Sequence, residues 1–233
     1  MSSDDNSVLI VGSTGLVGKE ILIQLNNSET IKNVYSLTRR KVPDFIPNVK
    51  TTEVIEPNII NWVNSMEKLC NENLKIFISS LGTTKAAAGS LERQYEIDHD
   101  LNLQLAKIAK KNLNIQTYIL VSTMAASSKS KFPYLKMKGQ LEEEIIDLKF
   151  NKTIILRPGV LLGKREKSKG LPASIASSLG SLVHNTFLAP YTLAPVSDKE
   201  IGRAILKIID ESKNYPDGSV KIIDATDLNK LAK

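Results

Sequence analysis

The chain has 233 residues, of which 42% are hydrophobic and 24% are charged, and this composition fits one soluble domain over residues 1–233 with a sizeable core. No apolar run approaches the roughly 20 residues that a membrane-spanning helix needs, and the single cysteine, Cys70, excludes an internal disulfide and a cysteine-based zinc cluster. The net charge of +6 comes from scattered basic residues without a recognisable nucleic-acid module, so we expect an anionic cofactor or lipid surface as a partner, no nucleic acid and no metal.

The polar, acidic residues 1–7 resemble neither a secretory signal nor an arginine-rich presequence, so we expect the chain to reside on the cytosolic side of membranes. The four apolar residues 8–11 predict a buried parallel strand, because a strand covered on both faces loses the usual alternation. Residues 19–25 have helical spacing. The glycine turn between them would offer free N–H groups to a pyrophosphate, although an ordinary strand-to-helix turn is the alternative. The expected cofactor contacts here are Gly12, Ser13, Thr14, Gly15, Leu16, Val17 and Gly18.

A second predicted strand, residues 34–38, runs into Arg39 and Arg40. In a dinucleotide-binding fold, an acid at this point accepts a hydrogen bond from the 2′-hydroxyl of the adenosine ribose and selects NAD, whereas arginine accommodates the 2′-phosphate of NADP. The acid is missing here, and planar guanidinium groups suit a phosphate. The sequence therefore predicts NADP(H) as the cofactor, with a solvated basic turn as the alternative.

Residues 74–82 predict a buried strand that ends in small residues, which leave room for a cofactor at the carboxyl edge of an open sheet. We expect residues 83–89 to form a flexible loop and residues 90–111 a long helix, from which His99 would point outward. A weaker strand is predicted over residues 49–56 and a helix over residues 59–69, with Cys70 buried after it. The candidate cofactor contacts of this region are Leu81, Gly82 and Thr83.

The second half of the chain continues the alternation of strands and helices, which predicts an α/β fold with a doubly wound parallel sheet. Residues 160–195 lack a clear pattern, and we expect them to form a small substrate-side lobe. Strands are predicted over residues 117–123, 153–159 and 220–223, and helices over residues 134–146 and 199–212, with Asp198 as an N-cap and a short tail helix at the end. Further cofactor candidates are Arg157, Pro158, Gly159 and Val160.

Three residues downstream of the glycine turn have the side chains that carbonyl reduction needs: Ser122, Tyr134 and Lys138. A carbonyl under reduction develops negative charge on its oxygen and needs a proton donor, but free tyrosine has a pKa of about 10. Tyr134 and Lys138 are four residues apart on one helix face, so the ammonium would favour the phenolate and lower that pKa. Lys138 would also bond the nicotinamide ribose, and the Ser122 hydroxyl would polarise the carbonyl, with Thr123 as its substitute if the register differs by one.

Two patterns, Gly-x-x-Gly-x-x-Gly at 12–18 and Tyr-x-x-x-Lys at 134–138, resemble the signatures of the short-chain dehydrogenase/reductase superfamily. Longer blocks at 94–106, 134–139 and 156–163 are similar to the fungal Fmp family, whose name means found in the mitochondrial proteome, and to the animal Tat-interactive oxidoreductase-like protein. The resemblance implies a Rossmann fold, NADPH in the glycine crevice and peripheral attachment to the cytosolic face of the mitochondrial outer membrane. Basic residues would assist that attachment, because each one near anionic lipid contributes about 1 kcal/mol.

One residue departs from the superfamily pattern. The superfamily often has an asparagine on the helix after the fourth strand, where it completes a proton relay, and that position here is Asp98. An anion near Lys138 would raise the pKa of the lysine or interrupt the relay. Two hypotheses follow, the first favoured: an NADP(H)-dependent oxidoreductase that reduces a small carbonyl with Tyr134 as its acid–base group, and a non-catalytic, NADPH-sensing interaction protein at the mitochondrial surface.

Overall fold

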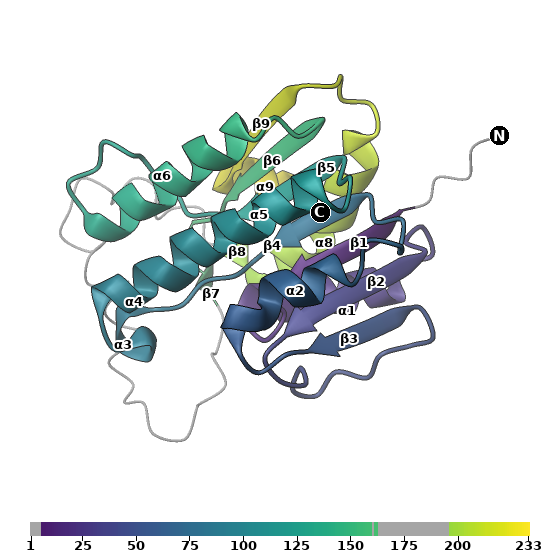
Figure 1. The fold of residues 1–233 in the computed structure, drawn as a ribbon. Coiled ribbons are helices and arrows are strands. Elements are labelled where there is room, and N and C mark those ends of the chain that lie inside the picture. Colours follow the sequence, from purple (N-terminus) through teal and green to yellow (C-terminus); the bar gives the residue numbers. More distant parts are fainter. Residues whose placement is uncertain (1–5, 160, 163–195) are drawn as a thin grey trace.

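The computed structural model describes residues 6–159, 161–162 and 196–233 (Figure 1). Within them, seven parallel strands form one sheet in the order β3-β2-β1-β4-β5-β6-β9. The chain moves outward from β1 to β3, returns to β4 beside β1, and continues in the other direction. This is the predicted doubly wound sheet, and in such sheets ligands bind outside the carboxyl ends of the strands where the order reverses.

The strands and helices follow one another along the chain in the predicted order. The strands of the large sheet are β1 (Ser7–Val11), β2 (Asn33–Thr38), β3 (Thr51–Ile55), β4 (Ile76–Ser79), β5 (Thr117–Val121), β6 (Lys152–Arg157) and β9 (Ser219–Asp224). A separate parallel pair is formed by β7 (Leu161–Leu162) and β8 (Val196–Ser197). The helices are α1 (Leu16–Asn27), the 3-10 helix η1 (Ile59–Asn61), α2 (Trp62–Glu67), α3 (Lys85–Ala88), α4 (Leu91–Tyr95), the π-helix η2 (Glu96–Leu101), α5 (Asn102–Lys111), α6 (Pro133–Asp147), α8 (Asp198–Ser212) and α9 (Ala225–Leu231).

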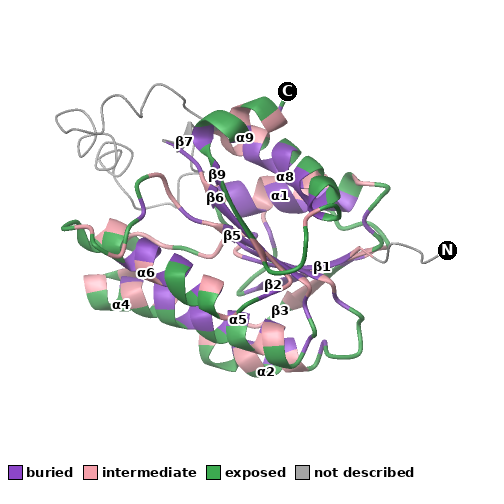
Figure 2. Cartoon of the chain, turned by 90° about the horizontal axis from the view of Figure 1, so that it is seen from above, coloured by how far each residue is buried: buried purple, intermediate pink, exposed green. Residues whose placement is uncertain are grey.

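Helices cover both faces of the sheet, with α1, α8 and α9 on one face and α2, α4, α5 and α6 on the other (Figure 2). Successive residues of a strand point to opposite faces, so β1 contributes to two cores. Val8 and Ile10 pack with residues of α1 and α8, whereas Leu9 and Val11 pack with residues of α2 and α5. All four have no exposed surface, which explains why this strand reads as a continuous apolar run.

The long helix predicted over residues 90–111 consists of α4, η2 and α5, and the expectation that His99 points outward from it is wrong. A π-helical turn contains an extra residue, so it rotates the residues that follow relative to a straight α-helix. His99 is 4% exposed and stacks on Tyr95 with ring centroids 4.4 Å apart. Its Nδ1 lies 2.9 Å from Asp100 Oδ1, and its Nε2 lies 3.3 Å from Glu144 Oε1 of α6.

Two other local predictions are also wrong. The loop expected over residues 83–89 contains the short helix α3, which begins because the Thr84 hydroxyl accepts a hydrogen bond from the Ala87 N–H at 3.1 Å. Cys70 is exposed rather than buried. It lies in the turns that follow α2, where the buried position belongs to its neighbour Leu69.

The N-cap of α8 lies one residue before the predicted Asp198. The Ser197 hydroxyl accepts a hydrogen bond from the Glu200 N–H at 3.2 Å, and the Glu200 carboxylate accepts one from the Ser197 N–H at 2.7 Å. This capping box satisfies two backbone donors at once and fits the Ser-x-x-Glu pattern. The expected substrate-side lobe, residues 160–195, falls almost entirely outside the described residues. None of the helices within the described ranges is both long enough and apolar enough to span a bilayer.

Candidate functional site

The loop between β1 and α1 lies where the strand order reverses, and glycine is required at two points in it. Gly12 has a φ of +85°, and a Cβ at this position would lie 2.4 Å from the carbonyl carbon of Ser80. A Cβ at Gly18 would lie 2.3 Å from the carbonyl oxygen of Gly12. Only residues without a side chain therefore let α1 and the end of β4 approach the loop this closely.

Gly15 lies at the start of α1. It is exposed, and it is the N-cap of α1 without any side-chain capping bond. The first turn of α1 also contains no acidic residue. The first backbone N–H groups of the helix and the positive end of its dipole therefore point to the carboxyl edge of the sheet without an internal acceptor. This arrangement fits the pyrophosphate of a dinucleotide.

The other predicted residues of this loop have different positions. The Ser13 hydroxyl is buried and hydrogen bonds the Ser36 hydroxyl of β2 at 2.8 Å, so it braces the loop against the sheet. Val17 is buried in the core. Thr14 and Leu16 are partly exposed, which leaves the backbone of residues 14–16 as the part of the loop that a ligand can reach.

Two of the predicted cofactor segments follow the strands on either side of β1. Arg39 and Arg40 are exposed and come directly after β2. Residues 81–83 follow β4. They start beside the glycine loop, since the Ser80 N–H just before them donates to the carbonyl oxygen of Val11, the last residue of β1, at 3.0 Å. The carboxyl ends of these parallel strands meet at one edge of the sheet, so the glycine loop, the arginines and residues 81–83 all lie at that edge.

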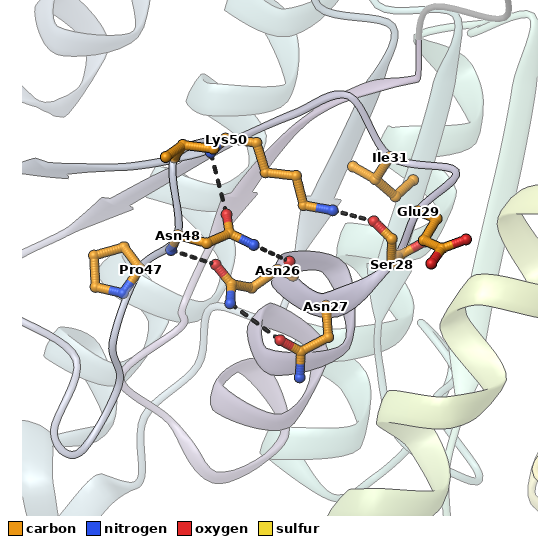
Figure 3. Close-up of a pocket in the computed structure, with 9 residues that line it drawn as sticks. Asn26, Asn27, Ser28, Glu29, Ile31, Pro47, Asn48 and Lys50 are labelled. Carbon is orange, nitrogen blue, oxygen red and sulfur yellow. Dashed lines mark hydrogen bonds between the residues drawn. The ribbon is translucent and has the colours of Figure 1, made fainter.

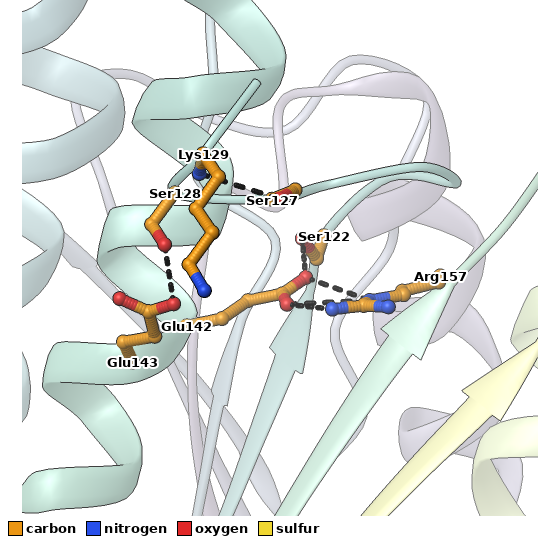
Figure 4. Close-up of polar contacts among 7 residues, drawn as sticks. All are labelled: Ser122, Ser127, Ser128, Lys129, Glu142, Glu143 and Arg157. Atoms are coloured by element: carbon orange, nitrogen blue, oxygen red, sulfur yellow. Dashed lines mark hydrogen bonds and ion pairs between the residues drawn. The ribbon is translucent and has the colours of Figure 1, made fainter.

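Ser122 belongs to a buried polar cluster with Glu142 of α6 and Arg157 of β6 (Figure 4). The Ser122 hydroxyl donates to Glu142 Oε1. The Arg157 guanidinium donates to both oxygens of that carboxylate, with its shortest contact, from Nη2, at 2.5 Å. Glu142 is 3% exposed, so this carboxylate is held by charge-assisted hydrogen bonds away from water.

Lys138 lies one helical turn before Glu142 and one turn after Tyr134 on α6. It is 3% exposed, and its Nζ donates to the Val121 carbonyl oxygen at 3.3 Å. Burial lowers the pKa of Lys138, while the carboxylates of Asp98 and Glu142 act in the opposite direction. The predicted anion near Lys138, the Asp98 carboxylate, is thus present, but burial outweighs its effect on the pKa of Lys138. Tyr134 is partly exposed at the start of the same helix face.

Asp98 lies in η2 and interacts electrostatically with this lysine. It is 2% exposed, and its Oδ1 accepts a hydrogen bond from the Thr83 N–H at 2.6 Å. Burial raises the pKa of Asp98 to about 6, against the opposing effects of the Lys138 ammonium and the Thr83 N–H. A buried carboxyl and a buried ammonium therefore influence each other at this point of the site.

Glu142 is the residue that the sequence reasoning missed. The sequence spacing could have identified it, because Tyr134, Lys138 and Glu142 are four residues apart and so share one helix face. Arg157, predicted as a cofactor contact, bonds this carboxylate, and its contact with a cofactor stays a prediction. Of the residues that follow it, Pro158 and Gly159 are buried, and the Pro158 carbonyl oxygen accepts from the Met124 N–H at 3.0 Å. Val160 lies outside the described residues.

A surface pocket of about 650 Å³ lies at the opposite, amino edge of the sheet (Figure 3). Its polar groups bond one another: the Asn48 N–H donates to Asn26 Oδ1 at 3.0 Å, and the Lys50 ammonium donates to the Ser28 carbonyl oxygen. The pocket is therefore separate from the candidate site. Its lining residues are Asn26, Asn27, Ser28, Glu29, Ile31, Pro47, Asn48, Val49 and Lys50.

Solved structures with the same fold are short-chain dehydrogenases and related enzymes. The YIR035C short-chain dehydrogenase/reductase from Saccharomyces cerevisiae aligns with a TM-score of 0.65 and 14% identity over 97% of this chain and 99% of that chain. The Bordetella bronchiseptica enzyme WbmF, solved in complex with NAD+, aligns with a TM-score of 0.66 and 12% identity over 100% of this chain and 78% of that chain. The fold is thus the Rossmann-like fold of the short-chain dehydrogenases/reductases.

The sequence comparisons identify the family within this class. The family model described as HIM1 matches residues 31–189. Curated relatives named "Protein FMP52, mitochondrial" are 40% identical in Meyerozyma guilliermondii, over 97% of this chain and 94% of the relative, and 37% identical in Candida albicans, over 97% and 98%. The chain belongs to the HIM1 family, and the resemblance to fungal Fmp proteins that the sequence blocks indicated is confirmed.

Proposed function

We propose that the protein binds NADP(H) across the carboxyl edge of the sheet, with the pyrophosphate at the start of α1. The donors would be the backbone amides of this turn other than that of Gly15, whose N–H already donates to the Gly12 carbonyl oxygen at 2.9 Å. The observation that supports this proposal most is the exposed, uncapped glycine at the start of α1, Gly15, beside the two glycines that admit no side chain. A helix N-terminus of this kind is an anion site with both free donors and a favourable dipole. The complex of WbmF with NAD+ shows a dinucleotide bound by a protein of this fold.

The preference for the phosphorylated cofactor rests on Arg39 and Arg40, which are exposed after β2. Hydrogen bonds to charged groups contribute about 1.5–3 kcal/mol, so replacing both arginines by alanine should weaken NADPH binding at least about tenfold and leave NADH binding unchanged. Fluorescence titration with each coenzyme measures this. Lys107→Ala/Lys111→Ala, which removes two exposed charges from α5, is the matched control. Equal affinity of the parent for NADH and NADPH would refute the assignment.

We further propose that the protein reduces a small carbonyl. The bound cofactor would supply a hydride to the carbonyl carbon. Tyr134 would give its proton to the carbonyl oxygen, and the Lys138 ammonium would stabilise the phenolate and bond the ribose. The Ser122 hydroxyl, already donating to Glu142, would orient the substrate through its oxygen, and the partly exposed Thr123 would be the donor that polarises the carbonyl.

Tyr134→Phe tests this chemistry because it removes only the phenolic hydroxyl. We expect turnover in a screen of small aldehydes and ketones with NADPH to disappear, and NADPH affinity to stay within about threefold of the parent, since the rate depends on the proton that the hydroxyl gives. Equal turnover in the variant would exclude Tyr134 as the acid–base group.

A second function, nucleotide sensing without turnover, is favoured by one observation. The Ser122 hydroxyl proton is directed to Glu142 and away from a substrate. In this case NADPH would fix the conformation in which the protein binds a partner, and no carbonyl would be reduced. Affinity for partner proteins isolated with and without NADPH separates the two functions: sensing predicts a dependence on NADPH, and partner affinity that NADPH does not change would refute it.

For location, we propose peripheral attachment to the cytosolic face of the mitochondrial outer membrane. The relatives named mitochondrial and the net charge of +6 support this proposal, because basic residues are attracted to anionic lipid. We expect the protein to fractionate with mitochondria, to be released by alkaline carbonate and to be degraded by protease added to intact organelles. Protection from protease would refute the cytosolic face.

A further inference from the structure

The segment between β5 and α6 combines an exposed aromatic ring with several positive charges. Phe132 is 50% exposed, and among the described residues it is the one aromatic side chain in the set of exposed large hydrophobic residues. Residues 124–141 contain no aspartate or glutamate. Lys129, Lys131 and Lys136 are exposed, and none of them forms an ion pair with a described residue. An exposed ring and three uncompensated cations thus share one short segment.

The backbone of this segment is fixed by the protein itself. The Ser127 N–H donates to the Leu135 carbonyl oxygen at 3.1 Å, and the Phe132 N–H donates to the Ser130 hydroxyl at 3.2 Å. The segment also packs directly on α6, because a Cβ at Gly139 would lie 2.2 Å from the carbonyl carbon of Ser127. A partner that covers Phe132 therefore does not have to order the loop, and such ordering is one of the main costs of binding.

A groove of about 320 Å³ lies beside this segment, where side chains of α4 and α6 face each other. Pro133, directly after Phe132, lines the groove, and so does the exposed Lys136. The buried Met137 also lines it, so the apolar surface that starts at Phe132 continues between the two helices. Apolar surface next to a cation suits a molecule with a hydrocarbon tail and an anionic head. The lining residues are Leu91, Tyr95, Pro133, Lys136, Met137 and Gln140.

We propose that residues 129–136 are the surface with which the protein binds an anionic lipid bilayer. The Phe132 ring enters the boundary between headgroups and acyl chains, where aromatic rings are favoured. The three exposed lysines of the segment bind the anionic headgroups, and each of them strengthens binding about fivefold. The inference rests on the peripheral attachment proposed above and assigns that attachment to one surface of the protein.

The charge of the segment decides between a bilayer and a second copy of the chain as the partner. Two copies that met through this surface would bring identical lysines together, because a two-fold contact pairs each patch with itself. Like charges that face each other at an interface are destabilising, whereas an anionic bilayer neutralises them. An exposed apolar ring inside a cationic segment therefore fits lipid better than self-association.

Co-sedimentation with vesicles measures the contribution of charge. Replacing the three lysines of the segment by alanine should weaken binding to vesicles of phosphatidylcholine and phosphatidylserine in equal parts at least about tenfold. The parent should bind vesicles of phosphatidylcholine alone at least about tenfold more weakly than the mixed vesicles. The matched control, Lys68→Ala/Lys107→Ala/Lys111→Ala, removes three exposed lysines at the end of α2 and on α5, and it should stay within about threefold of the parent because distant charges are screened. Equal losses in the two variants, or equal binding of the parent to both kinds of vesicle, would overturn the proposal.

Fluorescence quenching tests whether the ring enters the bilayer. The single tryptophan of the parent, Trp62, is 2% exposed, so mixed vesicles with brominated acyl chains should leave its emission unchanged. Phe132→Trp should add emission that these vesicles quench, because bromine quenches only a tryptophan that comes close to the acyl chains. Ile60→Trp, at an 81% exposed position of η1, is the matched control and should not be quenched. Vesicle-bound Phe132→Trp without quenching contradicts the proposal.

Thermal unfolding establishes that each variant is folded, and Phe132 can be replaced without loss of a cap because its side chain makes no capping bond to α6. Either measurement alone can overturn the proposal if a variant of the other is unfolded. A parent that binds none of these vesicles also overturns it and leaves an acidic protein as the partner of the segment. The assays use purified protein and synthetic lipid without coenzyme. They can therefore fail while a partner protein holds the chain at mitochondria, and they can succeed while protease protection refutes the cytosolic face.

Discussion

The buried Glu142 carboxylate provides a quantitative test of how the candidate site is held together. Glu142→Gln keeps the shape of the side chain but removes its charge, and its amide nitrogen cannot accept from Arg157 or Ser122. Breaking a buried ion pair costs about 3–5 kcal/mol. We expect the lower end, about 3 kcal/mol, because the Arg157 side chain is 29% exposed and can regain water, whereas the Glu142 side chain is 4% exposed.

Urea denaturation followed by the fluorescence of Trp62 measures this loss, since Trp62 is the single tryptophan of the chain and is 2% exposed. For a chain of this size, about 3 kcal/mol corresponds to a fall in Tm of about 6–12 °C. The adjacent Glu143, which bonds Ser128 at 2.5 Å on the exposed surface, is the control (Figure 4). Glu143→Gln should cost less than about 1 kcal/mol. If the two variants lose the same stability, the buried cluster does not hold the site and the reasoning is refuted.

Three further predictions concern the backbone of the glycine loop, a helix cap and one titrating group. Gly12→Ala should lower the unfolding free energy by about 3 kcal/mol, because the backbone is left-handed and the added Cβ would contact Ser80. Gly218→Ala has a similar φ of +82° but open space around it, so it should lose only about 1 kcal/mol. Urea denaturation of both variants measures the difference. Ser197→Ala should cost about 1 kcal/mol and Ser197→Gly only a few tenths, by the same assay. Burial raises the folded-state pKa of Asp98 from its ordinary 3.8 to about 6, so its contribution to stability is full below about pH 4 and is lost as the pH rises through about 6. Asp98→Asn should remove that loss, on the order of 3 kcal/mol, from the stability profile between about pH 4 and 7, and an unchanged profile would contradict the shift.

The strands of the sheet could be predicted because a buried strand consists of locally consecutive apolar residues. β1 is buried on both faces and has four consecutive apolar residues. β3 lies at the edge of the sheet and gave a weaker pattern, because four of its five residues are partly or fully exposed. The π-helix could not be predicted. One extra residue in a helical turn changes which side of the helix meets the sheet without changing the composition, so His99 was assigned to the wrong face.

The same limit applies to the candidate site. The spacing of Tyr134 and Lys138 places them on one helix face whatever the tertiary structure, so their proximity follows from the sequence. The partners of Ser122 and Arg157 depend on which face of α6 lies above β5 and β6, and no local pattern contains that information. The sequence predicted Arg157 as a cofactor contact but could not show that its guanidinium bonds Glu142.

Both helices beside the site place polar residues four apart on a face that is otherwise apolar. α6 presents Lys138 and Glu142, and η2 presents Asp98, with charges that balance once Arg157 is included. An isolated charge in such an interior would neutralise or draw in water, because removing it from water costs several kcal/mol. Each charged residue therefore requires its partner on another element. This requirement links β6, α6 and η2, and through the Thr83 N–H it extends to the loop that borders the glycine turn.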